Sequence, residues 1–336
     1  MQKIERQKYN KTLLVFNCHE AWVYQLGSLG YNLDIIIGLK GRAHPSWDER
    51  IRPVPKKSRL ITLSEALQSP TNYYCIITHN MTDLLDVKLR PEPKINVLHI
   101  SIETRALEEK SSLAPEKLKG VLHEYLDLIG GHAVAVTMSK GESWGFTEDV
   151  VNNSSNPSDY LPYSGHLASG LRIVNLLEAR KKYLLWDYQN IAFNEIPIRI
   201  VGHNPGMPGV QASKNWDNLK EILQSHRFYI HTADPRYEDG FNMASLEAMA
   251  AGMPVLGNRH PTSPIQHGKS GFLSDDPHEL QKYARILLED RDLAIKMCRQ
   301  AQKIVLERFS INCFRESFLK SIETARQKMA GKKIEV

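Results

Sequence analysis

The sequence predicts an α/β protein built from two doubly wound domains, each containing a parallel β-sheet. Short apolar runs rich in β-branched residues alternate with helix-like stretches, which is the pattern of βαβ units. The pattern occurs on both sides of a segment dense in Asn, Ser, Pro and Asp at 147–165. The length of 336 residues also fits two domains of about 150 residues each.

The strands and helices are expected where the apolar runs and the helical periodicity occur. Strands of the first half are expected at 12–18, 33–39, 74–80, 96–101 and 133–139. Strands of the second half are expected at 196–202, 227–233, 253–258 and 271–276, with helices between them at 213–225 and 278–289. These elements predict one domain over 1–150 and a second over 151–310.

The composition is typical of a globular protein outside the membrane. Hydrophobic residues make up 42% and charged residues 24% of the chain, and no apolar run approaches the roughly 20 residues that span a bilayer. The N-terminal residues lack a signal-peptide pattern, so we expect a cytoplasmic protein. The cysteines are far apart and form no CxxC pair, so their spacing predicts neither a zinc site nor a disulfide framework.

The net charge of +5 is concentrated in two segments, "RIRPVPKKSR" at 50–59 and the tail at 326–336. A solvated face is the simplest interpretation of both. Contact with an anionic ligand or with an anionic membrane surface is the alternative for 50–59. No aromatic residues are interleaved with these basic residues, so we expect no nucleic acid as a partner.

Three histidines follow predicted strands of the first half. His19 comes after "VFNC", His79 after "CIIT", and His99 lies near the end of "NVLHIS". Parallel sheets bind ligands beyond the carboxyl ends of their strands, so these side chains are expected to converge in a polar cleft.

The most informative stretch is "EDGFNMASLEAMAAGMPV" at 238–255. A strand, a loop and a helix are predicted in succession, with Gly252 ending the helix. Gly240 and the amides at the start of the helix predict an anion site. Glu247 lies about one turn into the helix, where its carboxylate reaches the same ligand. Acids on both sides of an anion site suit a sugar nucleotide; acids that only stabilise the helix dipole are the alternative.

The stretch 227–277 resembles the C-terminal signature of retaining glycosyltransferases of family 4. Members carry two acids separated by seven residues, an "EAMAxGxPV" run and a "GxxGFL"-like segment, which match "LEAMAAGMPV" and "HGKSGFL" here. The resemblance implies the GT-B fold, in which two Rossmann-like doubly wound domains face each other across an interdomain cleft. It also implies a C-terminal helix at 311–336 that returns to the N-terminal domain, with Phe314, Phe318, Leu319 and Ile322 on its buried face.

The resemblance assigns roles to residues of both halves. Asp239 takes the position of the first acid, Glu238 stands one residue earlier, and either one is expected to contact the donor sugar. Glu247 matches the acid that binds the ribose hydroxyls. His99 matches the histidine on the acceptor side of the donor sugar. The loop that faces the sugar and the diphosphate corresponds to the amides of Gly240, Phe241, Asn242 and Met243.

The family's Arg and Lys pair, which clamps the diphosphate, is absent in its usual form. The developing charge on the leaving diphosphate needs a cation, for which a guanidinium fork is well suited. Arg172 is the first choice for this role. The substitutes are Arg180, Lys181, Lys182 and Arg236.

The resemblance implies a metal-independent transfer of a glycosyl group from a nucleoside diphosphate sugar to an acceptor hydroxyl, with retention. We therefore expect no metal and no cofactor beyond the donor, and the Asp-x-Asp at 290–292 is predicted to be a polar turn. The acceptor is a saccharide, a lipid-linked molecule or a protein. A non-catalytic sugar-nucleotide-binding module and a sugar-nucleotide 2-epimerase are the alternative functions.

Overall fold

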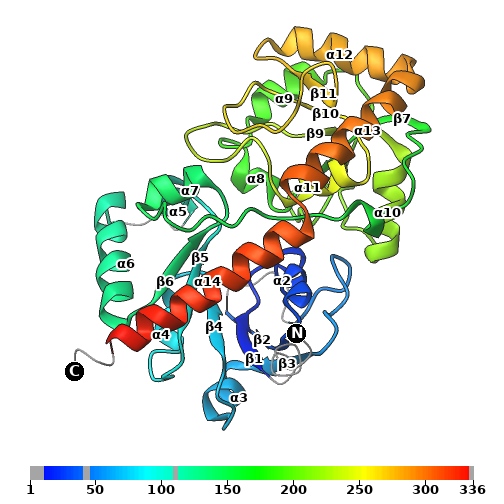
Figure 1. The fold of residues 1–336 in the computed structure, drawn as a ribbon. Helices are drawn as coiled ribbons and strands as arrows, with labels where there is room; N and C mark the ends of the chain where they lie inside the picture. The colour runs from blue at the N-terminus through cyan, green and yellow to red at the C-terminus, as the bar shows by residue number, and fades with distance from the viewer. Residues whose placement is uncertain (1–10, 41–45, 109–112, 333–336) are drawn as a thin grey trace. The chain divides into compact units, whose positions relative to one another are not determined.

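The computed structural model describes residues 11–40, 46–108 and 113–332, which form two compact units (Figure 1). The first unit contains the residues up to Asn152 together with those from Asn312 onward, and the second contains Asn153–Ile311. The chain therefore passes between the units inside the Asn- and Ser-rich segment and again at the start of its last helix.

Among its described residues, the first unit has a six-stranded sheet with the order β3-β2-β1-β4-β5-β6, and all of its pairings are parallel. The strands are β1 (Thr12–Phe16), β2 (Asn32–Ile37), β3 (Ser58–Thr62), β4 (Cys75–Thr78), β5 (Lys94–Leu98) and β6 (His132–Ala135). The helices are α2 (Glu20–Gln25), η1 (Leu26–Leu29), α3 (Leu63–Gln68), α4 (Met81–Asp86), α5 (Ile102–Glu108), α6 (Pro115–Ile129), α7 (Met138–Trp144) and α14 (Ile311–Lys332).

The second unit has a five-stranded sheet with the order β11-β10-β9-β7-β8, counted over the described residues, and it is also parallel throughout. The strands are β7 (Leu167–Ile173), β8 (Ile198–Val201), β9 (His226–Ile230), β10 (Val255–Gly257) and β11 (Gly271–Leu273). The helices are η2 (Pro157–Asp159), α8 (Leu177–Arg180), α9 (Trp186–Ala192), α10 (Trp216–Ser225), α11 (Met243–Ala250), α12 (Pro277–Glu289) and α13 (Arg291–Arg308). Both sheets run outward from a central strand in two directions, which confirms the doubly wound fold class.

Two strands are absent from the sequence-based prediction. Over the described part of the chain, the edge strand β3 pairs with β2 alone, and its residues are half-buried or exposed, so they form no apolar run. The strand β7 begins with two exposed residues and contains Gly170, where a Cβ would lie 2.5 Å from the ring of Phe228. The lack of side-chain volume at Gly170 is thus a packing requirement, although glycine lowers the β propensity of the segment.

The last helix, α14, lies across the first sheet (Figure 1). Phe314, Phe318 and Ile322 are buried, and the rings of both phenylalanines contact Trp22 edge-on. The helix is also bonded to the segment before β4, because Tyr74 Oη donates to Glu323 Oε1 at 2.5 Å. Residues at the far end of the sequence therefore complete the core of the first unit.

Phe318→Ala is expected to destabilise the first unit by about 3–5 kcal/mol, because it removes a fully buried aromatic ring and leaves a cavity beside Trp22. Calorimetry should show a lower melting temperature for the transition of the first unit. Glu316→Ala, at an exposed position of the same helix, is the matched control. Equal melting temperatures for the two variants would contradict the packing of α14 on this unit.

No helix in the described ranges combines the length and the hydrophobicity required to cross a lipid bilayer.

Candidate active site

The helix α11 begins at the carboxyl edge of the second sheet, after the loop that follows β9. Its residues Ser245–Ala250 are all buried, as expected for a helix that is apolar on most of its surface. Gly252 follows in the left-handed region with a φ of 93°, which confirms the predicted end of the helix. The start is fixed by a capping box, in which Asn242 and Ser245 accept from each other's backbone amides.

This cap changes the interpretation of the amides that were predicted to face a ligand. The Asn242 amide donates to Ser245 Oγ at 2.8 Å, and the Gly240 amide donates to Thr262 Oγ1 at 2.8 Å. The side chain of Phe241 is in the core, with its ring centroid 5.0 Å from that of Phe309. The amides of Gly240 and Asn242 are thus bonded inside the second unit, and the expectation that amides of this loop face a ligand stays a prediction.

The glycine at position 240 also has a structural reason. A Cβ there would lie 2.7 Å from the amide nitrogen of Ser263 and 2.9 Å from the side chain of His260. Gly240 thus permits the loop after β9 to pack closely against the loop after β10.

The three acids of the stretch differ in exposure. Asp239 is 1% exposed and Glu247 is 4% exposed, whereas Glu238 is half-buried. Glu247 is buried in the middle of α11, close enough to Tyr229 for its charge to add to the effect of burial, which raises the pKa of that phenol. Asp239 Oδ1 lies 3.4 Å from the hydroxyl of Thr262. Two carboxylates are therefore enclosed at this edge of the sheet, one before α11 and one inside it.

Two histidines that the sequence interpretation did not single out hold the acidic loop in place. His231 Nε2 donates to the carbonyl of Asp239 at 3.1 Å, and His260 Nε2 donates to the carbonyl of Glu238 at 3.0 Å. Burial lowers the pKa of His231 to about 4, and burial also lowers the pKa of His260, so both rings are neutral donors near pH 7. Each follows a strand of the second sheet, so the sheet-edge rule used for the first half could have identified them.

Arg172 does not occupy the position expected of a diphosphate clamp. Its side chain is buried within β7, where the guanidinium donates to Gln189 Oε1 and, at 2.8 Å, to Thr232 Oγ1. Burial lowers the pKa of Arg172 to about 10. Its donors bond to groups inside the second unit, so the assignment of Arg172 to the leaving diphosphate is corrected.

Other cations of the same edge are more accessible. Arg236 is 73% exposed and forms a bidentate ion pair with Asp234. The Nζ of Lys182 lies 5.1 Å from the centre of the Tyr237 ring, and the Arg236 guanidinium lies 5.5 Å from it. Lys181 is paired with Glu178 on the surface. Lys182 and Arg236 therefore bring positive charge to the loop that carries the acids.

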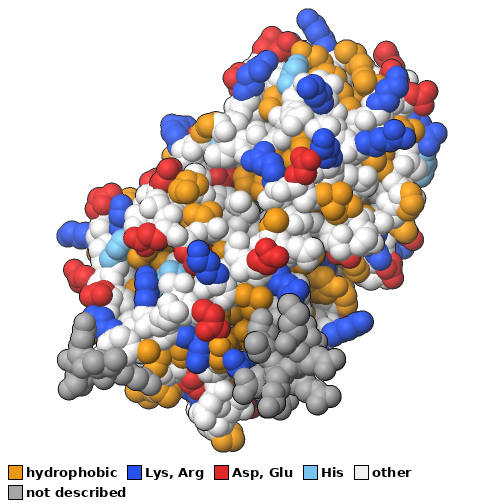
Figure 2. Space-filling model, viewed as in Figure 1, with side chains coloured by type: hydrophobic (Ala, Val, Ile, Leu, Met, Phe, Trp, Pro, Cys, Tyr) orange, Lys and Arg blue, Asp and Glu red, His pale blue; other side chains and the backbone are white. Residues whose placement is uncertain are grey.

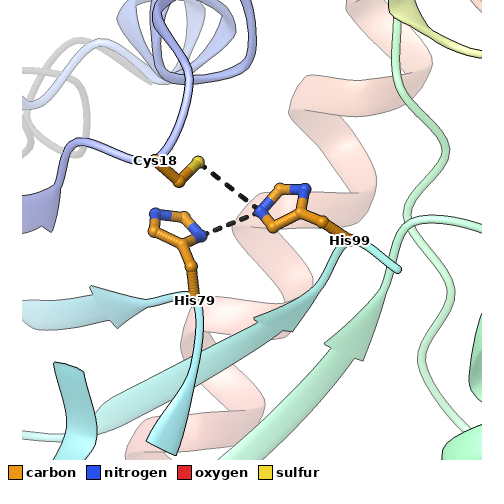
Figure 3. A group of neighbouring side chains, drawn as sticks. All are labelled: Cys18, His79 and His99. Atoms are coloured by element: carbon orange, nitrogen blue, oxygen red, sulfur yellow. Dashed lines mark hydrogen bonds between the residues drawn. The ribbon is translucent and has the colours of Figure 1, made fainter. Parts of the chain in front are cut away.

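In the first unit, His79 and His99 meet as predicted, but the third group is Cys18 (Figure 3). His99 Nε2 lies 2.9 Å from His79 Nδ1 and 3.6 Å from Cys18 Sγ. Burial, followed by the charge of His79, lowers the pKa of His99 well below its ordinary value. His19 is exposed just before α2, and its charge also lowers the pKa of His99, so it lies near this group.

Three of the five basic side chains of segment 50–59 are buried or paired with acids of the first unit. Arg52 is buried, Arg50 forms a bidentate pair with Asp48, and Arg59 forms one with the buried Asp34. On the face drawn in Figure 2, basic and acidic side chains are interspersed. Ion pairing thus accounts for Arg50 and Arg59 and burial for Arg52, while Lys56 and Lys57 are exposed.

The Asp-x-Asp at 290–292, predicted to be a polar turn, forms the start of α13, with Asp290 as its N-cap and Asp292 in its first turn. Asp290 lies between α12 and α13, and its Oδ1 accepts from the amide of Leu293 at 2.8 Å.

The sequence was compared with protein-family models and with known proteins, and both comparisons found matches. Residues 191–290 match the family model described as Glycosyl transferases group 1. The chain is 33% identical over 97 residues to N-acetyl-alpha-D-glucosaminyl L-malate synthase from Bacillus anthracis. The matched residues are 28% of this chain and 25% of that protein. The chain thus spans about a quarter of the length of this curated relative.

Solved structures share the fold over most of the chain. HepE from Anabaena, solved with UDP and glucose, has a TM-score of 0.65 at 12% identity and covers 94% of this chain and 100% of its own. Sucrose-phosphate synthase from Thermosynechococcus elongatus has a TM-score of 0.65 at 12% identity, with 96% and 100% covered. A mutant TarM from S. aureus has a TM-score of 0.56 at 14% identity, with 74% and 55% covered.

The family match includes Asp239, Glu247 and the whole of α11, which are the elements of the second unit described above. The structural matches cover both parallel-sheet units. The chain therefore has the GT-B fold, and its second unit carries the sequence features of the family Glycosyl transferases group 1.

Proposed function

We propose that this protein is a glycosyltransferase that moves a sugar from a nucleoside diphosphate sugar to an acceptor hydroxyl, with retention at the anomeric carbon, in polysaccharide or glycoconjugate synthesis. The observation that carries the proposal is the pair of enclosed carboxylates, Asp239 and Glu247, inside the segment that matches the family. The structure of HepE in complex with UDP and glucose supports a nucleotide-sugar donor.

Each acid has a separate role in this proposal. Glu247 accepts hydrogen bonds from the ribose hydroxyls of the donor, and a buried carboxylate makes such bonds stronger than neutral ones. Asp239 or Glu238 bonds to the transferred sugar. His231 and His260 position these acids through the carbonyls of Asp239 and Glu238 and are positioning residues. His99 lines the acceptor side of the donor sugar.

The diphosphate needs positive charge as the bond to the sugar breaks, and no metal is invoked for this step. Lys182 and Arg236 replace Arg172 in the proposal, because both lie on the acidic loop's side of the sheet and flank Tyr237. Arg236 has a planar fork of donors suited to phosphate oxygens, although it must first release Asp234.

Arg236→Met is expected to weaken binding of the nucleoside diphosphate roughly threefold to tenfold, because it removes an exposed charge-assisted contact. Arg172→Met, at the buried guanidinium, is the matched comparison and should change that affinity by less than twofold in any folded protein. Calorimetric titration with UDP and GDP measures both variants. A larger loss in Arg172→Met than in Arg236→Met would restore the first assignment.

The experiment that tests the proposed function measures release of nucleoside diphosphate. A thermal-shift panel of sugar nucleotides first identifies the donor, since a ligand at 100 times its Kd stabilises the folded protein by about 2.7 kcal/mol. The identified donor is then incubated with the protein without acceptor. Slow release of the nucleoside diphosphate supports a transferase, and binding without release supports a non-catalytic module. Release of a 2-epimer would favour an epimerase.

Two features of the proposal concern where the protein acts. A cytoplasmic location stays a prediction. Peripheral contact with an anionic membrane now depends on Lys56 and Lys57, which are exposed within the basic segment. Binding of the Lys56→Ser, Lys57→Ser double variant to anionic vesicles, compared with the unchanged protein, tests that contact.

A further inference from the structure

The first sheet brings together three side chains with the chemistry of metal ligands. Its strands β1, β4 and β5 are neighbours, and Cys18, His79 and His99 follow their carboxyl ends. Figure 3 shows the thiol and the two imidazoles pointing toward one another. One potential ligand atom of each residue lies within 4.8 Å of those of the other two.

Hydrogen bonding to the backbone fixes which nitrogen of His79 faces the cluster. His79 Nε2 lies 2.9 Å from the carbonyl oxygen of Phe16, which only accepts, so Nε2 carries the proton. The Nδ1 of the neutral ring then has its lone pair directed at His99 Nε2, 2.9 Å away. Histidines that bind metals characteristically donate their other ring N–H to a backbone carbonyl or a carboxylate. His79 is therefore oriented as a metal ligand would be.

The imidazole rings of His79 and His99 are also held by contacts with an aromatic side chain. Trp22 contacts His79 and His99 edge-on, with ring centroids 5.1 Å and 4.9 Å away. Trp22 is itself packed against Phe314 and Phe318 of α14. The two imidazoles are thus held by a buried aromatic wall, so little side-chain entropy is lost when an ion joins them.

Two of the three separations between ligand atoms are close to those around a tetrahedral ion, and the third, between Cys18 Sγ and the His79 ring nitrogen, is at most 4.8 Å and must shorten to about 3.6 Å. Zinc bonds of about 2.0–2.1 Å to nitrogen and about 2.3 Å to sulfur separate two nitrogens by roughly 3.3 Å and a nitrogen from the sulfur by roughly 3.6 Å. The 3.6 Å between Cys18 Sγ and His99 Nε2 already agrees. The two ring nitrogens, now 2.9 Å apart, must separate by about 0.4 Å.

We propose that Cys18, His79 and His99 bind a zinc ion through Sγ, Nδ1 and Nε2, with the fourth position open to water. A thiolate and two imidazoles favour zinc or cobalt over magnesium or calcium, which prefer oxygen ligands. On binding, the thiol releases one proton, and the proton of His99 moves from Nε2 to Nδ1. Lys140 and Arg105 add positive charge near His99, and the thiolate offsets one charge of the ion. No step of glycosyl transfer is assigned to the ion.

Cobalt titration of the chelator-treated full chain tests this site. We expect one cobalt per chain, visible bands of tetrahedral intensity and a near-ultraviolet charge-transfer band from the thiolate, all removed by added zinc. Cys18→Ser should lose the charge-transfer band and bind zinc at least tenfold more weakly, as should His79→Gln. Cys313→Ser, which removes an exposed thiol of the same unit, is the control and should behave as the unchanged protein.

A second measurement needs no variant. Zinc added to the unchanged protein should shift the ring nitrogen resonances of His79 and His99 and leave those of His123, in another part of the unit, unchanged. The proposal is overturned if the charge-transfer band is absent from the unchanged protein, if the band persists in a folded Cys18→Ser variant, or if zinc moves neither ring.

Discussion

Glu247→Gln is expected to weaken donor binding at least tenfold while leaving the second unit folded. The carboxylate is 4% exposed inside α11, where it would accept two hydroxyl protons from the donor ribose. Hydrogen bonds to charged groups contribute about 1.5–3 kcal/mol, and a loss of about 1.4 kcal/mol is a tenfold change in affinity. Glutamine retains the shape of the side chain but removes the charge. Calorimetric titration with the identified donor measures the difference.

The control for this variant is Glu289→Gln, which removes an exposed carboxylate at the end of α12 in the same unit. It should bind the donor as the unchanged protein does. Far-ultraviolet circular dichroism and melting temperatures establish that Glu247→Gln is folded. If a folded Glu247→Gln binds the donor normally, the acid serves the packing or capping of α11, and the proposed function loses its main support.

The fold could be predicted from the sequence because buried parallel strands consist of continuous runs of apolar, β-branched residues. This pattern identified β1, β2 and β4, whose residues are almost all buried. It failed at β3, which lies at an edge and is half exposed, and at β7, which begins with exposed residues and requires Gly170 for packing. An apolar pattern in the sequence reflects burial of side chains. Strands with few buried side chains, or with glycine in place of a larger residue, are therefore not predicted from it.

The candidate site was less predictable, because the partners of a polar side chain depend on contacts between distant segments. The sequence places Asp239 and Glu247 on either side of the start of α11. It does not reveal that the loop after β10 approaches closely enough for Thr262 to accept from the Gly240 amide. Arg172 has the side chain of a phosphate ligand, yet strand pairing encloses it beside Gln189.

The cluster in the first unit shows the same limit. Cysteine spacing along the chain predicts no metal site, since metal motifs are recognised from ligands close in sequence. Cys18 and His99 are separated by 81 positions, and only the strand order β1-β4-β5 makes them neighbours. The sheet-edge rule anticipated His79 and His99, but it did not single out Cys18, which precedes His19 after the end of β1.

Asp239→Asn is expected to lower the turnover number about 100-fold while changing the donor Kd less than threefold. Bonds to the reacting sugar tighten as positive charge develops at the anomeric carbon, so their loss affects the transition state more than the ground state. Asp239 is 1% exposed, and His231 holds its carbonyl at 3.1 Å. Its carboxylate therefore needs little reorganisation when the charge develops. Single-turnover rates at saturating donor, paired with calorimetry, separate the two quantities.

Glu238→Gln decides which acid contacts the sugar. Glu238 is half-buried and shares the loop, and His260 bonds its carbonyl at 3.0 Å, so its backbone is fixed as firmly as that of Asp239. The two variants thus differ in the enclosure of the side chain that is changed. We expect Glu238→Gln to lower turnover less than tenfold. A larger loss in Glu238→Gln than in Asp239→Asn would exchange their roles, and normal turnover in both would exclude this loop from the chemistry.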